Sequence, residues 1–80
     1  MDYLKKYIET EKGSVLFTLY KLPYNQRFLV IATDYDQHYH LFYMHREEVW
    51  QIVNSKQIPE WLLLAEKELC NEIERHHYST

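Results

Sequence analysis

Apolar and polar residues alternate through the middle of the chain, and this alternation predicts a small antiparallel sheet. Three runs of β-forming residues cover positions 14–22, 27–34 and 38–44, separated by short polar breaks at 23–26 and 34–37. A parallel return would need a crossover of about a dozen residues, so breaks this short favour an antiparallel meander.

The segments on either side of this meander have apolar spacings that predict helices. Residues 2–13 carry apolar side chains at helical spacing between a capping residue, Asp2, and a glycine stop, Gly13. Residues 45–53 begin with acidic residues, as a helix N-terminus favours, and residues 59–75 start at Pro59 and repeat apolar positions every three and four residues. The predicted fold class is α+β: an N-terminal helix, a three-stranded meander and two C-terminal helices, in one domain spanning residues 1–80.

Neither side of the predicted sheet is polar. A sheet with one solvated face normally alternates apolar and charged residues, but the charged positions inside these runs are few, chiefly Lys21, Arg27 and the two histidines of the third run. We therefore expect both faces of the sheet to be covered.

Tyrosine is the residue type that departs most from ordinary composition. Aromatic residues make up 16% of the chain, and eight of them are tyrosines, which are enriched where an apolar body meets a wet partner surface. If the strands pair through their short turns, several side chains of the meander form one apolar patch. The candidate partner-binding residues are Tyr20, Leu29, Ile31, Tyr35, Tyr39, Leu41 and Tyr43.

Composition and charge exclude several classes of protein. With 46% apolar and 26% charged residues the chain should fold, and its net charge of −3 without a basic cluster disfavours nucleic-acid binding. No apolar run approaches the roughly 20 residues of a membrane span, and the N-terminus lacks the apolar core of a secretion signal. A single cysteine, Cys70, is typical of a reducing compartment, so we expect a cytoplasmic protein.

Residues that could carry chemistry are sparse. His38 and His40 lie two apart on a predicted strand and could share a metal with Asp36 or His45, but such a pair recurs by chance. Cys70 lies within the apolar stripe of the last predicted helix, where an unreactive buried thiol is the commoner outcome. A chain with one glycine cannot build a glycine-rich phosphate loop. We therefore expect neither enzymatic activity nor a cofactor, and assign no catalytic or metal-ligating residue.

These patterns favour a small protein-binding module, or a stoichiometric inhibitor, that acts through an aromatic-rich apolar surface. Its expected partner is another protein or a second copy of the chain in a homodimer. Two alternatives stay open: a metal-binding protein that uses His38 and His40, and a regulator that contacts nucleic acid. The excess of residues with AT-rich codons favours a source such as a low-GC bacterium, its prophage or another mobile element.

Overall fold

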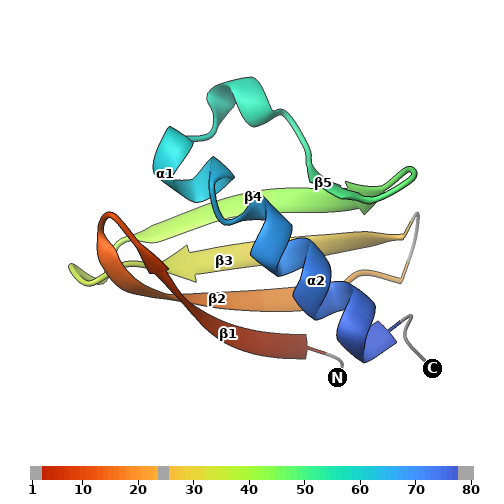
Figure 1. Cartoon of the computed structure of the whole chain (residues 1–80), viewed down its shortest axis with the longest axis horizontal. Helices are drawn as coiled ribbons and strands as arrows, with labels where there is room; N and C mark the ends of the chain where they lie inside the picture. The colour runs from red at the N-terminus through yellow and green to blue at the C-terminus, as the bar shows by residue number, and fades with distance from the viewer. Residues whose placement is uncertain (1–2, 24–25, 78–80) are drawn as a thin grey trace.

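The architecture is one antiparallel sheet followed by short helical segments. A computed structural model describes residues 3–23 and 26–77. The strands are β1 (Tyr3–Thr10), β2 (Gly13–Lys21), β3 (Arg27–Thr33), β4 (Tyr39–Arg46) and β5 (Trp50–Ile52), in the order β1-β2-β3-β4-β5. A 3₁₀ turn η1 (Ser55–Gln57) and the helices α1 (Glu60–Leu63) and α2 (Glu66–His77) follow (Figure 1).

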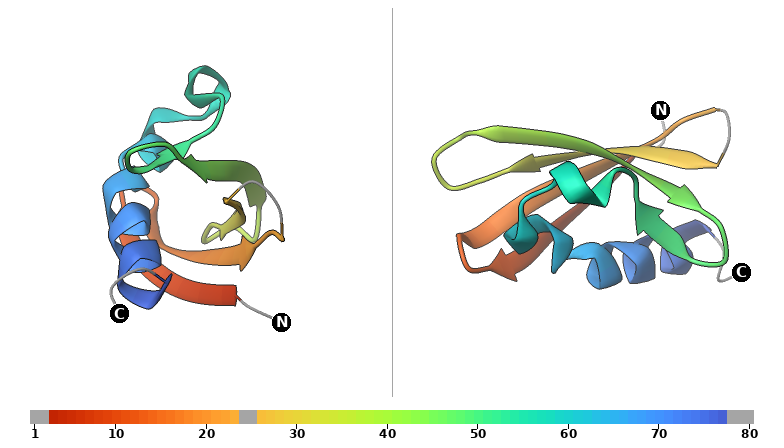
Figure 2. Two further views of the ribbon diagram at one scale, coloured as in Figure 1. Left: turned by 90° about the vertical axis from the view of Figure 1, so that its right-hand side faces the viewer. Right: turned by 90° about the horizontal axis from the view of Figure 1, so that it is seen from above.

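The sheet curves into a half-barrel, and α2 lies along its concave side (Figure 2). The core fills the space between them and is formed by alternate residues of every strand together with one side of α1 and α2. Its buried apolar residues are Ile8, Val15, Phe17, Leu19, Phe28, Val30, Ala32, Phe42, Met44, Trp50, Ile52, Trp61, Leu62, Ala65, Leu69 and Ile73. Because successive side chains of a strand point to opposite sides, the residues between these positions lie on the convex side.

Three side-chain contacts fix α2 across the opening of the half-barrel. The Ile52 backbone N–H donates to Glu66 Oε2 at 2.7 Å, which joins the start of α2 to β5. One turn and a half further on, Lys6 Nζ of β1 lies 3.8 Å from Glu72 Oε1. Arg46 Nε lies 3.7 Å from Glu74 Oε2. The helix therefore connects the two edge strands, β1 and β5, and closes the core.

The predicted N-terminal helix is wrong, because residues 3–10 form strand β1. Their pattern fits both periods: Leu4 and Ile8 are at helical spacing, but they also alternate with outward residues as a strand requires. Pairing with β2 decides between the two. Gly13, at φ +93°, closes the two-residue hairpin loop after Thr10 instead of ending a helix, and the Thr10 hydroxyl accepts a hydrogen bond from the Lys12 N–H.

The predicted helix over residues 45–53 is also wrong. The chain turns after Arg46 and returns as β5, in which Trp50 and Ile52 point into the core and Gln51 is exposed. Trp50 packs edge-on against Phe28, with ring centroids 5.1 Å apart. Burying this indole through a two-residue period outweighs the helical preference of the local sequence.

Only the last helical segment stands where a helix is predicted, and it is divided in two. The Ala65 N–H donates to the Leu62 carbonyl at 3.0 Å, a tight turn that separates α1 from α2. The turn lets Trp61, Leu62 and Leu69 all reach the core, while Leu64 is exposed. The fold is thus a five-stranded meander with helical cover at its C-terminal end, instead of a helix, three strands and two helices. The predicted N-cap Asp2 and the turn residues 24 and 25 lie outside the described residues.

Candidate functional site

On β1 to β4 the convex side of the sheet presents three complete rows of four side chains, and we call these twelve residues the outer face. Glu9, Ser14, Arg27 and His45 lie on the same side, beyond the two ends of the rows. The register of the strands places the members of each row directly beside one another. The rows are Tyr3–Tyr20–Leu29–Tyr43, Lys5–Thr18–Ile31–Leu41 and Tyr7–Leu16–Thr33–Tyr39. Nine of the twelve are tyrosine, leucine or isoleucine, so this face is apolar in composition although α2 lies on the other side of the sheet.

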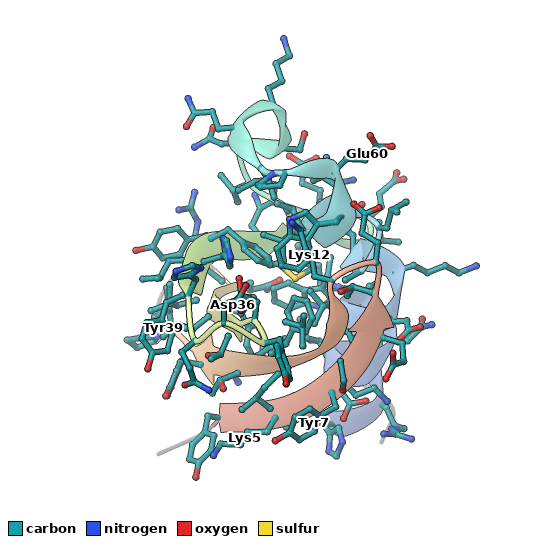
Figure 3. All side chains as sticks on the ribbon, turned by 90° about the vertical axis from the view of Figure 1, so that its left-hand side faces the viewer. Lys5, Tyr7, Lys12, Asp36, Tyr39 and Glu60 are labelled. Atoms are coloured by element: carbon teal, nitrogen blue, oxygen red, sulfur yellow. The ribbon has the colours of Figure 1, made fainter. Side chains whose placement is uncertain are left out.

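Exposure on the outer face rises from the middle strands to the border strands. Tyr7 on β1 and Tyr39 and Leu41 on β4 are 68%, 66% and 60% exposed. On β2 and β3 the corresponding side chains are half-buried, and Thr18 is only 8% exposed. Figure 3 shows Lys5, Tyr7 and Tyr39 pointing away from the enclosed side of the curved sheet.

Contacts among the tyrosines order one corner of the outer face. The rings of Tyr3 and Tyr20, in the first row, lie 5.7 Å apart at a tilt of 36°. Lys5 Nζ lies 5.8 Å from the centroid of the Tyr3 ring, within the range of a cation–π interaction. This contact places the ammonium group of Lys5 over an aromatic ring at the border of the outer face.

The structure brings most of the predicted partner-binding residues together. Tyr20, Leu29 and Tyr43 are neighbours in the first row, Ile31 and Leu41 in the second, and Tyr39 in the third. Tyr35 lies instead in the turn between β3 and β4, where it is 84% exposed and off the sheet.

Six of the twelve residues of the outer face are absent from the predicted set, and three of the six, Tyr3, Tyr7 and Leu16, are apolar or aromatic. Tyr3 and Tyr7 are absent because the sequence predicts a helix over residues 2–13. Their alternation with the inward-pointing Leu4 and Ile8 is the signal that could identify them.

The turn between β3 and β4 holds a cluster of polar side chains around Asp34. Asp34 Oδ1 accepts hydrogen bonds from the backbone N–H groups of Asp36 and His38 at 3.0 and 2.9 Å. Its Oδ2 lies 3.1 Å from His40 Nε2 and 3.9 Å from His38 Nδ1. The His38 N–H is the main cause that lowers the pKa of Asp34, and the His40 hydrogen bond adds to it.

This turn is where the predicted pair His38 and His40 lies, and Asp34 is the residue that the sequence analysis missed. Ligand atoms of Asp34, Asp36 and His38 lie within 4.8 Å of one another, whereas His45 is at the other end of β4. The hydrogen bonds of Asp34 organise the turn, and the ring of His40 packs edge-on against Trp61 at 5.2 Å. Structural roles within the chain thus account for Asp34 and His40.

A buried carboxylate on α2 has a comparable explanation. Glu72 is 7% exposed, although its spacing assigns it to the solvated side of the helix. Arg75 Nη2 and His76 Nε2 each lie 2.9 Å from a Glu72 carboxylate oxygen, and Lys6 approaches it from β1. These partners compensate the charge and fix the end of α2 against the sheet.

Comparison with protein-family models, curated proteins and solved structures finds no match to this chain. Within the described residues, no helix is both long enough and apolar enough to cross a membrane. The features that can indicate a function are therefore the outer face and the two polar clusters, around Asp34 and around Glu72.

Proposed function

We propose that this chain is a protein-binding module whose binding surface is the outer face. The observation that carries the proposal is the exposure of a contiguous apolar surface on the side of the sheet that α2 leaves uncovered. Residues such as Leu41 and Tyr39 contribute nothing to the core, because they point away from it. Exposed apolar groups that cluster, instead of being scattered singly, are typical of interaction sites.

The arrangement of side chains within the outer face supports a protein partner over nucleic acid. Stacking of bases needs aromatic rings in the middle of the face together with cations that follow a phosphate backbone. Here the middle strands present mainly aliphatic and hydroxyl side chains, such as Leu29, Ile31 and Thr18, and most tyrosines stand at the borders. An apolar centre with an amphipathic rim matches the anatomy of a protein–protein interface.

The polar clusters do not compete with this proposal. The carboxylates of Asp34 and Glu72 are engaged within the chain, and Cys70 packs partly buried against the core. We therefore propose that the chain is a non-enzymatic protein that occupies the surface of its partner, as a stoichiometric inhibitor does. A cytoplasmic location is part of the proposal, and the free Cys70 is compatible with it.

Site-specific photo-cross-linking in the native host tests this function. With p-benzoylphenylalanine in place of Tyr43 or Tyr39, irradiation should yield covalent adducts to protein. The matched control carries the same group in place of Leu64, which is 73% exposed but lies between α1 and α2, away from the outer face. Adducts from positions 43 and 39 and none from 64 support the proposal. No adduct from either outer-face position, or equal yields from all three, overturns it.

A further inference from the structure

We infer that the occupant of the outer face is a second copy of this chain. The two copies would meet face to face across a two-fold axis that runs parallel to the strands, between β2 and β3. The inference rests on the proposed function and gives it a specific partner. Four features of the outer face carry it: the pattern of its rows, the sizes of its side chains, its charge and its area.

The pattern of the rows is self-complementary about this axis. The rotation places β1 opposite β4 of the partner, and β2 opposite β3. Tyr3 then lies opposite the partner's Tyr43, and Tyr7 opposite the partner's Tyr39. In the middle, Thr18 lies opposite the partner's Ile31. Tyrosine thus meets tyrosine at both borders, and in the centre only Tyr20, opposite the partner's Leu29, is aromatic; the contact is the same from either copy, as in an isologous interface.

The sizes of the side chains compensate for the curvature of the sheet. A convex backbone touches another convex backbone only along its middle strands, unless the border side chains reach further. On the outer face the borders, β1 and β4, carry the long residues, including Tyr3, Tyr7, Tyr39 and Tyr43. Apart from Tyr20, the middle strands carry shorter ones, such as Thr18 and Ile31. The side-chain surface is therefore flatter than the backbone beneath it, and two copies can pack over the whole face.

Charge favours contact through this face over any contact through α2. Lys5 is the one ionisable side chain, apart from the tyrosines, among the twelve residues of the outer face, and it lies at the border. α2 carries four glutamates, at positions 66, 68, 72 and 74, against one lysine and one arginine, at positions 67 and 75. Two copies of a chain with net charge −3 repel each other least where the surface is nearly neutral.

The area of the outer face determines how tightly two copies are expected to bind. Four strands about 4.8 Å apart, with about five residues at 3.3 Å each along the three rows, span on the order of 300 Å². Two copies together then remove on the order of 600 Å² from water, which is the size of a weak, transient contact. We therefore expect a dimer with a dissociation constant on the order of 100 µM, formed and lost as concentration changes.

Sedimentation velocity of the full chain between about 1 and 500 µM tests the inference, with charge variants that probe the axis. Leu41 lies opposite the partner's Lys5 in this arrangement. Leu41→Lys sets lysine against lysine at two places and should weaken the dimer at least about tenfold. Leu41→Glu sets glutamate against lysine and should keep the dissociation constant within about threefold. Leu64→Lys, a control of equal charge away from the face, should leave it unchanged.

Three results overturn the inference. A monomer at every concentration excludes the second copy as partner. Equal weakening by Leu41→Lys and Leu41→Glu excludes this axis, and weakening by Leu64→Lys places the contact elsewhere. The photo-adducts keep the two proposals distinguishable: adducts of about twice the chain mass of 9.9 kDa support self-association. Adducts only to other proteins, from a chain that sediments as a monomer, remove the second copy and leave the protein-binding function standing.

Discussion

The two faces of one sheet differ in what their apolar residues do. Leu19 and Leu41 are the same residue type on strands β2 and β4, yet Leu19 is fully buried in the core and Leu41 is 60% exposed. The inner face holds the fold together by removing its side chains from water. The outer face contributes little to that burial, and its apolar composition is what the proposed binding function would explain. The predictions below test how completely these two roles are separated.

The largest effect is expected from the inner face. Leu19→Ala leaves a cavity beneath α2 and should lower the free energy of unfolding by about 2–5 kcal/mol. Urea denaturation followed by tryptophan fluorescence measures this change. Ile73→Val, which removes one methylene group from another fully buried position, should cost about 0.5–1.5 kcal/mol and stays measurable if the alanine variant does not fold. A loss below about 1 kcal/mol for a folded Leu19→Ala would contradict the assigned core.

The next largest effect concerns the attachment of α2 to β5. Glu66→Ala removes the acceptor of the Ile52 N–H and leaves that donor unpaired at a part-buried position. The expected loss is about 1–3 kcal/mol in the free energy of unfolding. Glu68→Ala is the matched control, because Glu68 is an exposed residue of the same first turn. Equal effects of the two substitutions would show that the Glu66 contact does not hold the helix in place.

The turn between β3 and β4 should make stability depend on pH. The pKa of Asp34 is lowered in the folded chain, so its charged form stabilises the fold at and above the ordinary value of 3.8, and this contribution is lost as pH falls through the folded value. Carbon-detected NMR titration of the Asp34 carboxyl group measures that pKa directly. Asp34→Asn should remove this part of the acid dependence, whereas Asp36→Asn should not. A pKa at or above 3.8 would be inconsistent with the hydrogen bonds described.

The smallest effect is expected on the outer face. Leu41→Ala should change the free energy of unfolding by no more than about 0.5 kcal/mol, because the side chain is mostly in water already. The same urea titration measures it beside Leu19→Ala. A loss of about 2 kcal/mol or more would show that the outer face supports the fold of the monomer, and the contrast between the two faces would disappear.

The central strands were accessible from sequence, and the two ends of the sheet were not. Alternation over 14–22, 27–34 and 38–44 placed strands there because short polar breaks leave little choice of pairing. Residues 3–10 satisfy a helical and a strand period equally well, and only pairing with β2 decides between them. Residues 50–52 are too short a strand for any period to emerge, and the packing of Trp50 on Phe28 fixes them.

The outer face was predictable only where the strands themselves were predictable. Tyr20, Leu29, Ile31, Tyr39, Leu41 and Tyr43 could be grouped because the register of three strands follows from their turns. Tyr3 and Tyr7 could not be added while their segment was interpreted as a helix. The expectation that both faces are covered stays untested for the outer face, since the predicted first two helices are strands of the sheet itself and leave no further helix among the described residues to cover it. The part of the chain left to form α1 and α2 covers one face only.

The most direct test of the separation between the faces is the yield of photo-adducts at position 43 in a chain that also carries Leu41→Lys. That substitution is on the exposed face and should leave the urea midpoint unchanged, while it introduces a charge on a border strand of the binding surface, beside position 43. We predict that the adducts are lost although the fold is intact. An undiminished yield of adducts in a folded Leu41→Lys chain would contradict the outer face as the binding surface.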